Sequence, residues 1–305
     1  MAVTIHSPTL SSHVPPMTLS KLRPLRHLSH HLRRRSLAVS AAAVRQDTTL
    51  WTPTPLLKIS PAAESLFSIT IDVSESPELA ASYTKAGQYL QLRLPEPESK
   101  PSFLAIASPP TAAASDGVFE FLVKSVAGST AELLCGLQKG DLVELSPAMG
   151  KGFDVDQISP PESYQTVLIF ATGSGIRLGK RCTGENMHWI TFEIIIWHCP
   201  CQFLGYPIRS LIEAGFGAEK RYDVRLYYGA RDLNKMAYQE RFKAWESSGV
   251  NIVPVLSQPG DSWTGEKGYV QDALVRNKNI TNPQSTGVVL CGQKQMAEVS
   301  SYQEF

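Results

Sequence analysis

The stretch that most restricts the possible folds of this chain is an apolar run ending in two glycines, residues 167–176, V-L-I-F-A-T-G-S-G-I. An unbroken apolar run of strand length is typical of a strand buried on both faces of a parallel sheet. Ligands collect at the carboxyl ends of such strands, and Gly173 and Gly175 lack the Cβ that would hold the backbone away from a diphosphate. The third glycine of a full dinucleotide motif is missing. For this stretch alone, an ordinary tight turn is therefore an equally good interpretation.

The first half of the chain has the pattern of short antiparallel strands. Apolar residues alternate with polar or small ones in four stretches separated by Gly and Pro: residues 66–73, 89–94, 118–126 and 142–145. One helical turn is expected at residues 131–137. Alternation of this kind predicts an antiparallel barrel or sandwich.

The second half alternates strands with helices. Buried strands are expected at residues 167–171, 224–228, 250–255 and 287–291, and helices at 207–215, 235–247 and 269–275. This order is typical of an α/β domain with a parallel sheet. We therefore predict a β barrel over residues 46–157 and an α/β domain over residues 158–305.

Composition excludes several classes of function. Residues 1–46 hold seven of the 29 Lys and Arg residues and no acid, which leaves 22 basic and 28 acidic residues in the rest of the chain. This net negative charge on the rest of the chain argues against nucleic acid as a partner. Five of the seven His lie within residues 1–31, so a histidine-based catalytic triad is not expected. No apolar run is long enough for a membrane span, and the odd number of Cys does not indicate a disulfide framework.

Residues 1–45 are rich in Ser, Arg, His and Leu and end in small residues, L-A-V-S-A-A-A. They lack the continuous apolar core of a secretory signal, so we expect a disordered organelle transit peptide. The content of Ser and Pro favours a plastid over a mitochondrion. A basic tail without a targeting role is the alternative interpretation.

Seven short motifs resemble the ferredoxin-NADP reductase family, and they occur in that family's order. In the second half they are A-T-G-S-G-I at 171–176, P-I-R-S at 207–210, Y-G-A-R at 228–231, G-Y-V-Q-D-A-L at 268–274 and C-G-Q-K-Q-M at 291–296. The first half adds G-S-T-A-E-L-L at 128–134 and P-A-M-G-K-G-F at 147–153. The resemblance covers most of residues 50–296.

This resemblance implies a flavin-dependent oxidoreductase in which the barrel holds FAD and the second domain holds NADP or NAD. NAD(P)H would deliver a hydride to the flavin, and electrons would pass to an unidentified acceptor, with a small redox protein as one candidate. The implied nucleotide contacts are Thr172, Gly173, Ser174, Gly175, Ile176, Pro207, Arg231, Ser257, Lys267, Tyr269 and Gly292. Cys291 would lie beside the nicotinamide, although a small buried core residue is an equally good interpretation. Gln258 replaces an arginine found in NADP-preferring members, so NADP is favoured only weakly.

The implied flavin contacts depart from the family pattern. They are Lys100, Phe103 and Ala105, followed by Gly128, Ser129 and Thr130. Ala105 offers neither the ring nor the hydroxyl that relatives bring to the flavin, and Lys100 supplies a charge without the two-pronged geometry of arginine. A non-catalytic protein that binds a nucleotide or a partner on a degenerate reductase fold is therefore the second hypothesis.

Residues 177–206 form an insert of thirty residues where the family has one small residue. The insert holds three of the five Cys and both His that lie outside the leader. Its abrupt change in composition suggests translated intron sequence, which a comparison of transcripts would test. Cys199 and Cys201 are too close for a structural zinc site, so we expect no metal. After Met296 we expect the family's last helix and strand to be missing.

Overall fold

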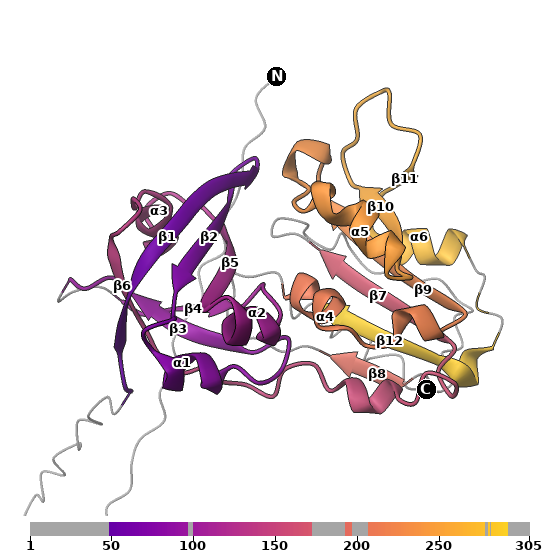
Figure 1. Ribbon diagram of the computed structural model, residues 1–305. Coiled ribbons are helices and arrows are strands. Elements are labelled where there is room, and N and C mark those ends of the chain that lie inside the picture. The colour runs from indigo at the N-terminus through magenta and orange to yellow at the C-terminus, as the bar shows by residue number, and fades with distance from the viewer. Residues whose placement is uncertain are drawn as a thin grey trace, which may run out of the picture. The chain divides into compact units, whose positions relative to one another are not determined.

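The structure, a computed structural model, describes residues 49–96, 100–172, 207–277, 280 and 282–291, together with the backbone of 193–196. Residues 48–305 form one compact unit. This unit contains two six-stranded sheets that follow one another along the chain (Figure 1).

The first sheet is antiparallel, with the order β4-β3-β6-β1-β2-β5. Its strands are β1 (Thr52–Ala63), β2 (Leu66–Asp72), β3 (Tyr89–Arg93), β4 (Ser102–Ala105), β5 (Val118–Lys124) and β6 (Leu142–Leu145). Just beyond β4, the Ala107 N–H donates to the Glu120 carbonyl of β5 at 2.8 Å, which draws the two end strands together. The sequence-based prediction of an antiparallel barrel is confirmed.

Alternation along β5 gives this strand two different faces. Phe119, Phe121 and Val123 point into the barrel core, whereas Leu122 belongs to a cluster shared with the second half of the chain. Successive side chains of a strand point to opposite sides. Glu120 therefore lies on the same outward face as Leu122.

Strand β1 was not predicted, because it carries prolines. Its first four residues pair only with β6, and the Leu56 N–H donates to the Asp141 carbonyl at 2.9 Å. Backbone groups alternate in direction, so Pro53 and Pro55 turn their missing N–H away from β6. The prolines cost no ladder hydrogen bond on that side.

The second sheet is parallel, with the order β11-β10-β9-β7-β12-β8. Its strands are β7 (Thr166–Thr172), β8 (Glu193–Ile196), β9 (Asp223–Ala230), β10 (Asn251–Leu256), β11 (Glu266–Lys267) and β12 (Thr286–Cys291). The predicted α/β class is confirmed. Strand β8 lies inside the insert and pairs with β12, so the insert adds an edge strand that the sequence did not reveal.

Helices lie on both faces of the parallel sheet. They are α4 (Ile208–Ala214), α5 (Phe242–Ser247) and α6 (Val270–Arg276). Val289 and Cys291 of β12 join the cluster that contains α4 and α5 residues, while Val288 and Leu290 pack with α6 on the other face. The three short helices of the first half are α1 (Pro77–Ser82), α2 (Pro110–Ser115) and α3 (Thr130–Cys135).

The helix predicted at residues 235–247 is wrong in its first half. Two 3₁₀ turns, Leu233–Lys235 and Gln239–Arg241, precede α5, which begins only at Phe242. Tyr238 has a φ of 65°, a left-handed conformation that a continuous right-handed helix cannot contain. Trp245 of α5 is buried.

Candidate functional site

The carboxyl ends of β7 and β12 form the point at which the strand order of the parallel sheet reverses. Strand β9 lies on one side of β7 and β12 on the other. Open α/β sheets bind ligands in the crevice at such a switch point. Thr172 ends β7 and Cys291 ends β12, so the structure brings these two predicted contacts to the same edge of the sheet.

Helix α4 starts at this same edge. Burial raises the pKa of the Cys291 thiol to about 12, and a hydrogen bond from the Ile208 N–H at the start of α4 opposes that shift. The thiol is therefore protonated at neutral pH. Pro207, another predicted contact, precedes α4 and is buried.

Five consecutive residues of α4, 208–212, are buried. A helix that packs on one sheet only exposes the side chains on its opposite face. Because residues 208–212 span more than one turn and are all buried, another part of the chain must cover that opposite face of α4. Leu66 of β2 and Leu122 of β5 belong to the same cluster as Ile208 and Leu211. The barrel therefore supplies the second cover.

Charged side chains connect α4 to its neighbours on both sides. The Arg209 guanidinium forms an ion pair with Glu120 of β5 and a second one, at 2.9 Å, with Glu213. Glu213 also accepts hydrogen bonds from Arg241 at 2.8 Å and from the Trp245 indole at 3.2 Å. Burial lowers the pKa of Arg209, but the Glu120 and Glu213 carboxylates outweigh burial and raise it overall.

Hydroxyl groups make further contacts beside this ion pair. The Tyr83 hydroxyl donates to the Ser108 carbonyl at 2.7 Å, and the Ser108 side chain accepts from the Glu120 N–H at 3.1 Å. The Ser210 hydroxyl of α4 accepts from the Gly87 N–H at 3.2 Å. Burial raises the pKa of Tyr83 above its usual range, so the phenol stays neutral.

The predicted flavin contacts lie on β4 and at the start of α3. Lys100 is exposed, Phe103 is half-buried with its ring 5.8 Å from that of Tyr89, and Ala105 is fully buried. The space around Gly128 is open, because a Cβ added there would meet nothing within 4 Å. Gly128 adopts a φ of 74°, which favours glycine.

Ser129 caps α3, and its hydroxyl accepts from the Glu132 N–H at 3.4 Å. The Glu132 carboxylate accepts from the Gly128 N–H at 2.7 Å. The Gly128 amide is therefore already occupied by the Glu132 carboxylate, next to Thr130 at the start of α3.

The predicted adenosine contacts lie at the same carboxyl edge of the sheet, on the side of β9, β10 and β11. Arg231 and Gln258 follow β9 and β10, and the Arg231 guanidinium donates to the Gln258 amide oxygen at 2.7 Å. The Ser257 N–H donates to the Ala230 carbonyl at 3.0 Å, which holds the end of β10 against β9. Lys267 is exposed and Tyr269 is half-buried.

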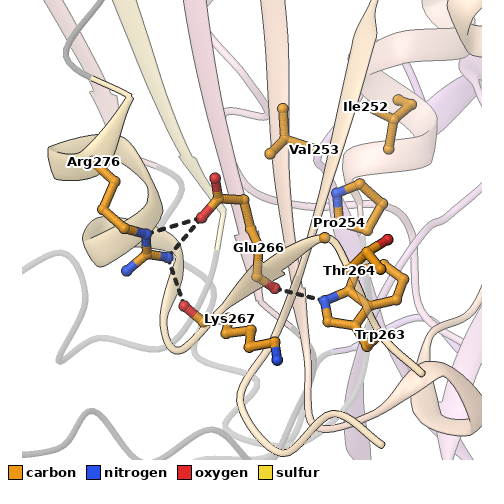
Figure 2. A pocket seen from close by; sticks show the side chains of 9 residues that line it. Ile252, Val253, Pro254, Trp263, Thr264, Glu266, Lys267 and Arg276 are labelled. Atoms are coloured by element: carbon orange, nitrogen blue, oxygen red, sulfur yellow. Dashed lines mark hydrogen bonds and ion pairs between the residues drawn. The ribbon is translucent and has the colours of Figure 1, made fainter. Parts of the chain in front are cut away.

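A hollow of about 590 Å³ lies beside β10 and the edge strand β11. Figure 2 shows the side chains that line it. Ile252, Val253 and Pro254 of β10 line one side, and the Trp263 ring lines the other. The Trp263 indole N–H donates to the Glu266 carbonyl at 2.9 Å. Lys267 lines the hollow, whereas Ser257, Arg231 and Tyr269 do not.

Other predicted contacts lie outside the residues that the structure describes: Gly173, Ser174, Gly175, Ile176 and Gly292. Most of the insert lies there as well. Sequence reasoning missed Arg209, Glu120 and Tyr83. Arg209 was visible inside the P-I-R-S motif, but nothing in the sequence told which side of α4 would be covered.

The described residues contain neither a metal-binding cluster nor a membrane-spanning helix. No group of three or more His, Cys, Asp or Glu in these ranges is arranged to hold a metal ion. Within the same ranges, no helix has the length and apolar character to cross a membrane.

Comparisons with known proteins agree with this architecture. Residues 206–301 match the family described as the oxidoreductase NAD-binding domain. Fruit protein pKIWI502 of Actinidia deliciosa is 45% identical over 312 residues, which cover 97% of this chain and 87% of the relative. The match to this relative spans both sheets, whereas the family model covers only the later strands of the second sheet.

Solved structures share the fold at low identity. A ferredoxin NADP+ reductase from Neisseria gonorrhoeae, solved with FAD and NADP, has a TM-score of 0.58 and 19% identity, covering 83% of this chain and 89% of that one. The cytochrome b5 reductase domain of Ulva prolifera nitrate reductase has a TM-score of 0.58 and 16% identity, with 82% and 89% covered.

Proposed function

Because the chain belongs to the family of fruit protein pKIWI502, among the ferredoxin-NADP reductase-like oxidoreductases, we propose that it transfers electrons from NAD(P)H through FAD to an acceptor. A small redox protein is one candidate for this acceptor.

The packing of the sheet switch point against the barrel is the observation that carries this proposal. Cys291 and the start of α4 lie at the switch point, and α4 packs on β2 and β5. A nucleotide held at the carboxyl ends of β7 and β12 would therefore lie on the side of the α/β domain that faces the barrel. Transfer between two cofactors needs this proximity.

The barrel would hold FAD through Lys100, the Gly128 turn, Ser129 and Thr130. When bound, FAD supplies a ring that accepts a hydride and releases electrons to an acceptor. The side chain at Ala105 cannot hydrogen-bond that ring, so backbone groups of β4 would orient it.

The α/β domain would hold NAD(P)H through Thr172 and the glycines of residues 173–175, with Lys267 and Tyr269 at the adenosine end. Cys291 would pack beside the nicotinamide. Its thiol, protonated at neutral pH, would pack there as a small side chain and would not act as a nucleophile.

A purified full-length chain tests the proposal. Flavin released by denaturation is measured by mass spectrometry, and turnover is measured with NADPH or NADH and an artificial acceptor. The proposal expects bound FAD and acceptor reduction that depends on NAD(P)H. A folded chain without flavin and without turnover, even after incubation with FAD, would contradict it.

A variant in which one serine replaces residues 177–206 tests whether the insert affects activity. Turnover in this variant alone would show that the insert blocks the family chemistry. Equal turnover in both chains would show that the insert is tolerated. Loss of the folded state in the variant alone would show that the pairing of β8 with β12 supports the sheet.

A non-catalytic nucleotide-binding protein is the second candidate. The contact between the Glu132 carboxylate and the Gly128 amide favours it, because a carboxylate there repels a diphosphate. Calorimetry with FAD, NADPH and NADH separates the two. Nucleotide binding without flavin binding supports the second candidate.

We also propose that residues 1–45 direct the chain to a plastid. Their content of Arg and Ser and their lack of acid support this proposal. A fluorescent protein fused after residue 45 is expected to accumulate in plastids of plant cells. Accumulation in mitochondria or in the cytosol would contradict it.

A further inference from the structure

Helix α4 is the place where the two halves of the molecule meet. Its residues 208–212 are buried, and its cluster includes Leu66 and Leu122 from the barrel as well as Val167 and Val289 from the parallel sheet. Such packing is close but not directional. Apolar contacts alone would let α4 slide or turn by a small amount against the barrel.

One buried ion pair adds direction to this packing. Arg209 of α4 and Glu120 of β5 are in contact, and their side chains are 8% and 23% exposed. Arg209 is also fixed from its own side, because Glu213 holds its Nε at 2.9 Å. Two carboxylates thus hold different nitrogens of the planar guanidinium, which fixes its orientation as well as its distance from β5.

Glu120 is equally constrained on the barrel side. Its N–H donates to the Ser108 hydroxyl at 3.1 Å, and its carbonyl accepts from the Ala107 N–H at 2.8 Å. The strand that carries the carboxylate is therefore anchored where β4 and β5 come together. Arg209 therefore pairs with a residue whose backbone is hydrogen-bonded on both sides within the barrel.

Other polar contacts also join the two halves. The Gly87 N–H donates to the Ser210 hydroxyl at 3.2 Å, and the Glu64 N–H donates to the Asn234 carbonyl at 2.7 Å. Lys235 reaches Glu64 at 2.8 Å, but those side chains are 32% and 54% exposed. Within the described residues, Arg209–Glu120 is the ion pair between the halves that water screens least.

We propose that the Arg209–Glu120 ion pair is a positioning element that holds the start of α4, and with it the carboxyl ends of β7 and β12, in register with the barrel. This inference rests on the proposed function. Neither residue needs to touch the reacting atoms. Their role is to keep the two cofactor-binding halves at the separation that hydride transfer requires.

Hydride transfer is sensitive to such positioning. Reacting atoms must lie about 3–3.5 Å apart, and a displacement of about 1 Å can slow a reaction on the order of 100-fold. Glu120→Ala is therefore expected to slow flavin reduction by NAD(P)H about 10-fold or more, with little effect on the affinity of either cofactor. Glu120→Asp retains the charge and is expected to recover part of the rate.

Glu144→Ala is the matched control. Glu144 pairs with Arg93, its side chain is 25% exposed, and both residues belong to the barrel. Like Glu120→Ala, this substitution removes one ion pair from a carboxylate of similar exposure, but it leaves the contact between α4 and the barrel unchanged. Glu144→Ala is expected to leave the reduction rate within about twofold of wild type. The reason is that Glu144 lies within the barrel, and a substitution has little effect on a distant site with which it shares no contacts.

The experiment combines stopped-flow flavin reduction with hydrogen exchange on the full chain. Exchange is measured without added cofactor at the amides of Gly87 and Glu64, which bond across the junction, and at β2 amides inside the barrel. Glu120→Ala is expected to speed exchange at the two junction amides and leave β2 unchanged. Glu144→Ala is expected to leave the junction amides unchanged.

The two readouts distinguish this inference from the proposed function. If the wild-type chain shows no NAD(P)H-dependent flavin reduction, the proposed function fails and hydrogen exchange alone decides the positioning role. Unchanged exchange at Gly87 and Glu64 in Glu120→Ala would overturn the inference. Equal slowing of flavin reduction by Glu120→Ala and Glu144→Ala would overturn it as well.

Discussion

Replacing Arg221 by methionine is expected to destabilise the α/β domain strongly. Arg221 is 9% exposed, and its guanidinium donates to three main-chain carbonyls: Tyr164 at 2.5 Å, Ile158 at 2.8 Å and Phe216 at 3.1 Å. It therefore joins the segment before β7 to the segment after α4. Methionine has a similar length but no donor, so all three carbonyls lose this partner.

The expected magnitude follows from these contacts. A hydrogen bond from a charged donor contributes about 1.5–3 kcal/mol, and freed carbonyls recover part of it from water, so we expect a loss of about 3–5 kcal/mol. With a urea m value of about 3 kcal/mol/M, the unfolding midpoint falls by about 1–1.7 M. Trp245 lies in the same cluster as Phe216 and Ile158, so its fluorescence reports the transition.

Arg276→Met is the control for this measurement. Arg276 also donates to a carbonyl, that of Lys267 at 2.6 Å, and pairs with Glu266, but its side chain is 48% exposed. Exposed pairs contribute about 0–1 kcal/mol, so the midpoint should move by at most about 0.3 M. Equal shifts for the two variants would refute the reasoning that burial makes the Arg221 contacts strong.

Three further predictions concern the site. Cys291 is expected to resist alkylation in the native chain at pH 8. The stability that its thiol contributes is present below about pH 8.5, its unfolded pKa, and declines as pH rises toward its folded pKa of about 12; rapid native alkylation by mass spectrometry would contradict this. Gly265→Ala places a Cβ too close to the Trp263 ring, so the ring must move and its fluorescence should shift; an unchanged spectrum would count against the packing described. Lys267→Ala should raise KM for NADPH about 10-fold and leave KM for NADH unchanged if its amine meets the 2′-phosphate; Lys243→Ala, an exposed site on α5, is the control, and equal changes for both coenzymes would reject that role.

Hydrophobic pattern was enough to predict most strands. Alternation located β2, β3 and β5, and the apolar run of residues 167–171 located β7, because each strand buries one or both faces in a regular way. The prolines hid β1, since whether a proline breaks a ladder depends on which side its nitrogen faces. The left-handed backbone conformation of Tyr238 excludes the first half of the helix predicted at residues 235–247, which side-chain periodicity could not rule out.

Prediction of the candidate site was limited by what local sequence can encode. The ends of β7 and β12 followed from motif order, and the structure brings Thr172 and Cys291 to one sheet edge. The ion pair of Arg209 with Glu120 joins residues 89 positions apart, one on helix α4 and the other on strand β5. No spacing rule predicts such a contact, because it depends on how α4 packs on the barrel.

The central claim is that the two halves hold FAD and NAD(P)H for direct hydride transfer. An anaerobic titration of the flavin-loaded chain with NADPH or NADH, followed by the visible absorbance of the flavin, tests it most directly. We expect one equivalent of the preferred coenzyme to bleach the flavin completely. A flavin that keeps its oxidised spectrum with excess NADPH and NADH, in a chain that binds both cofactors, would contradict the account.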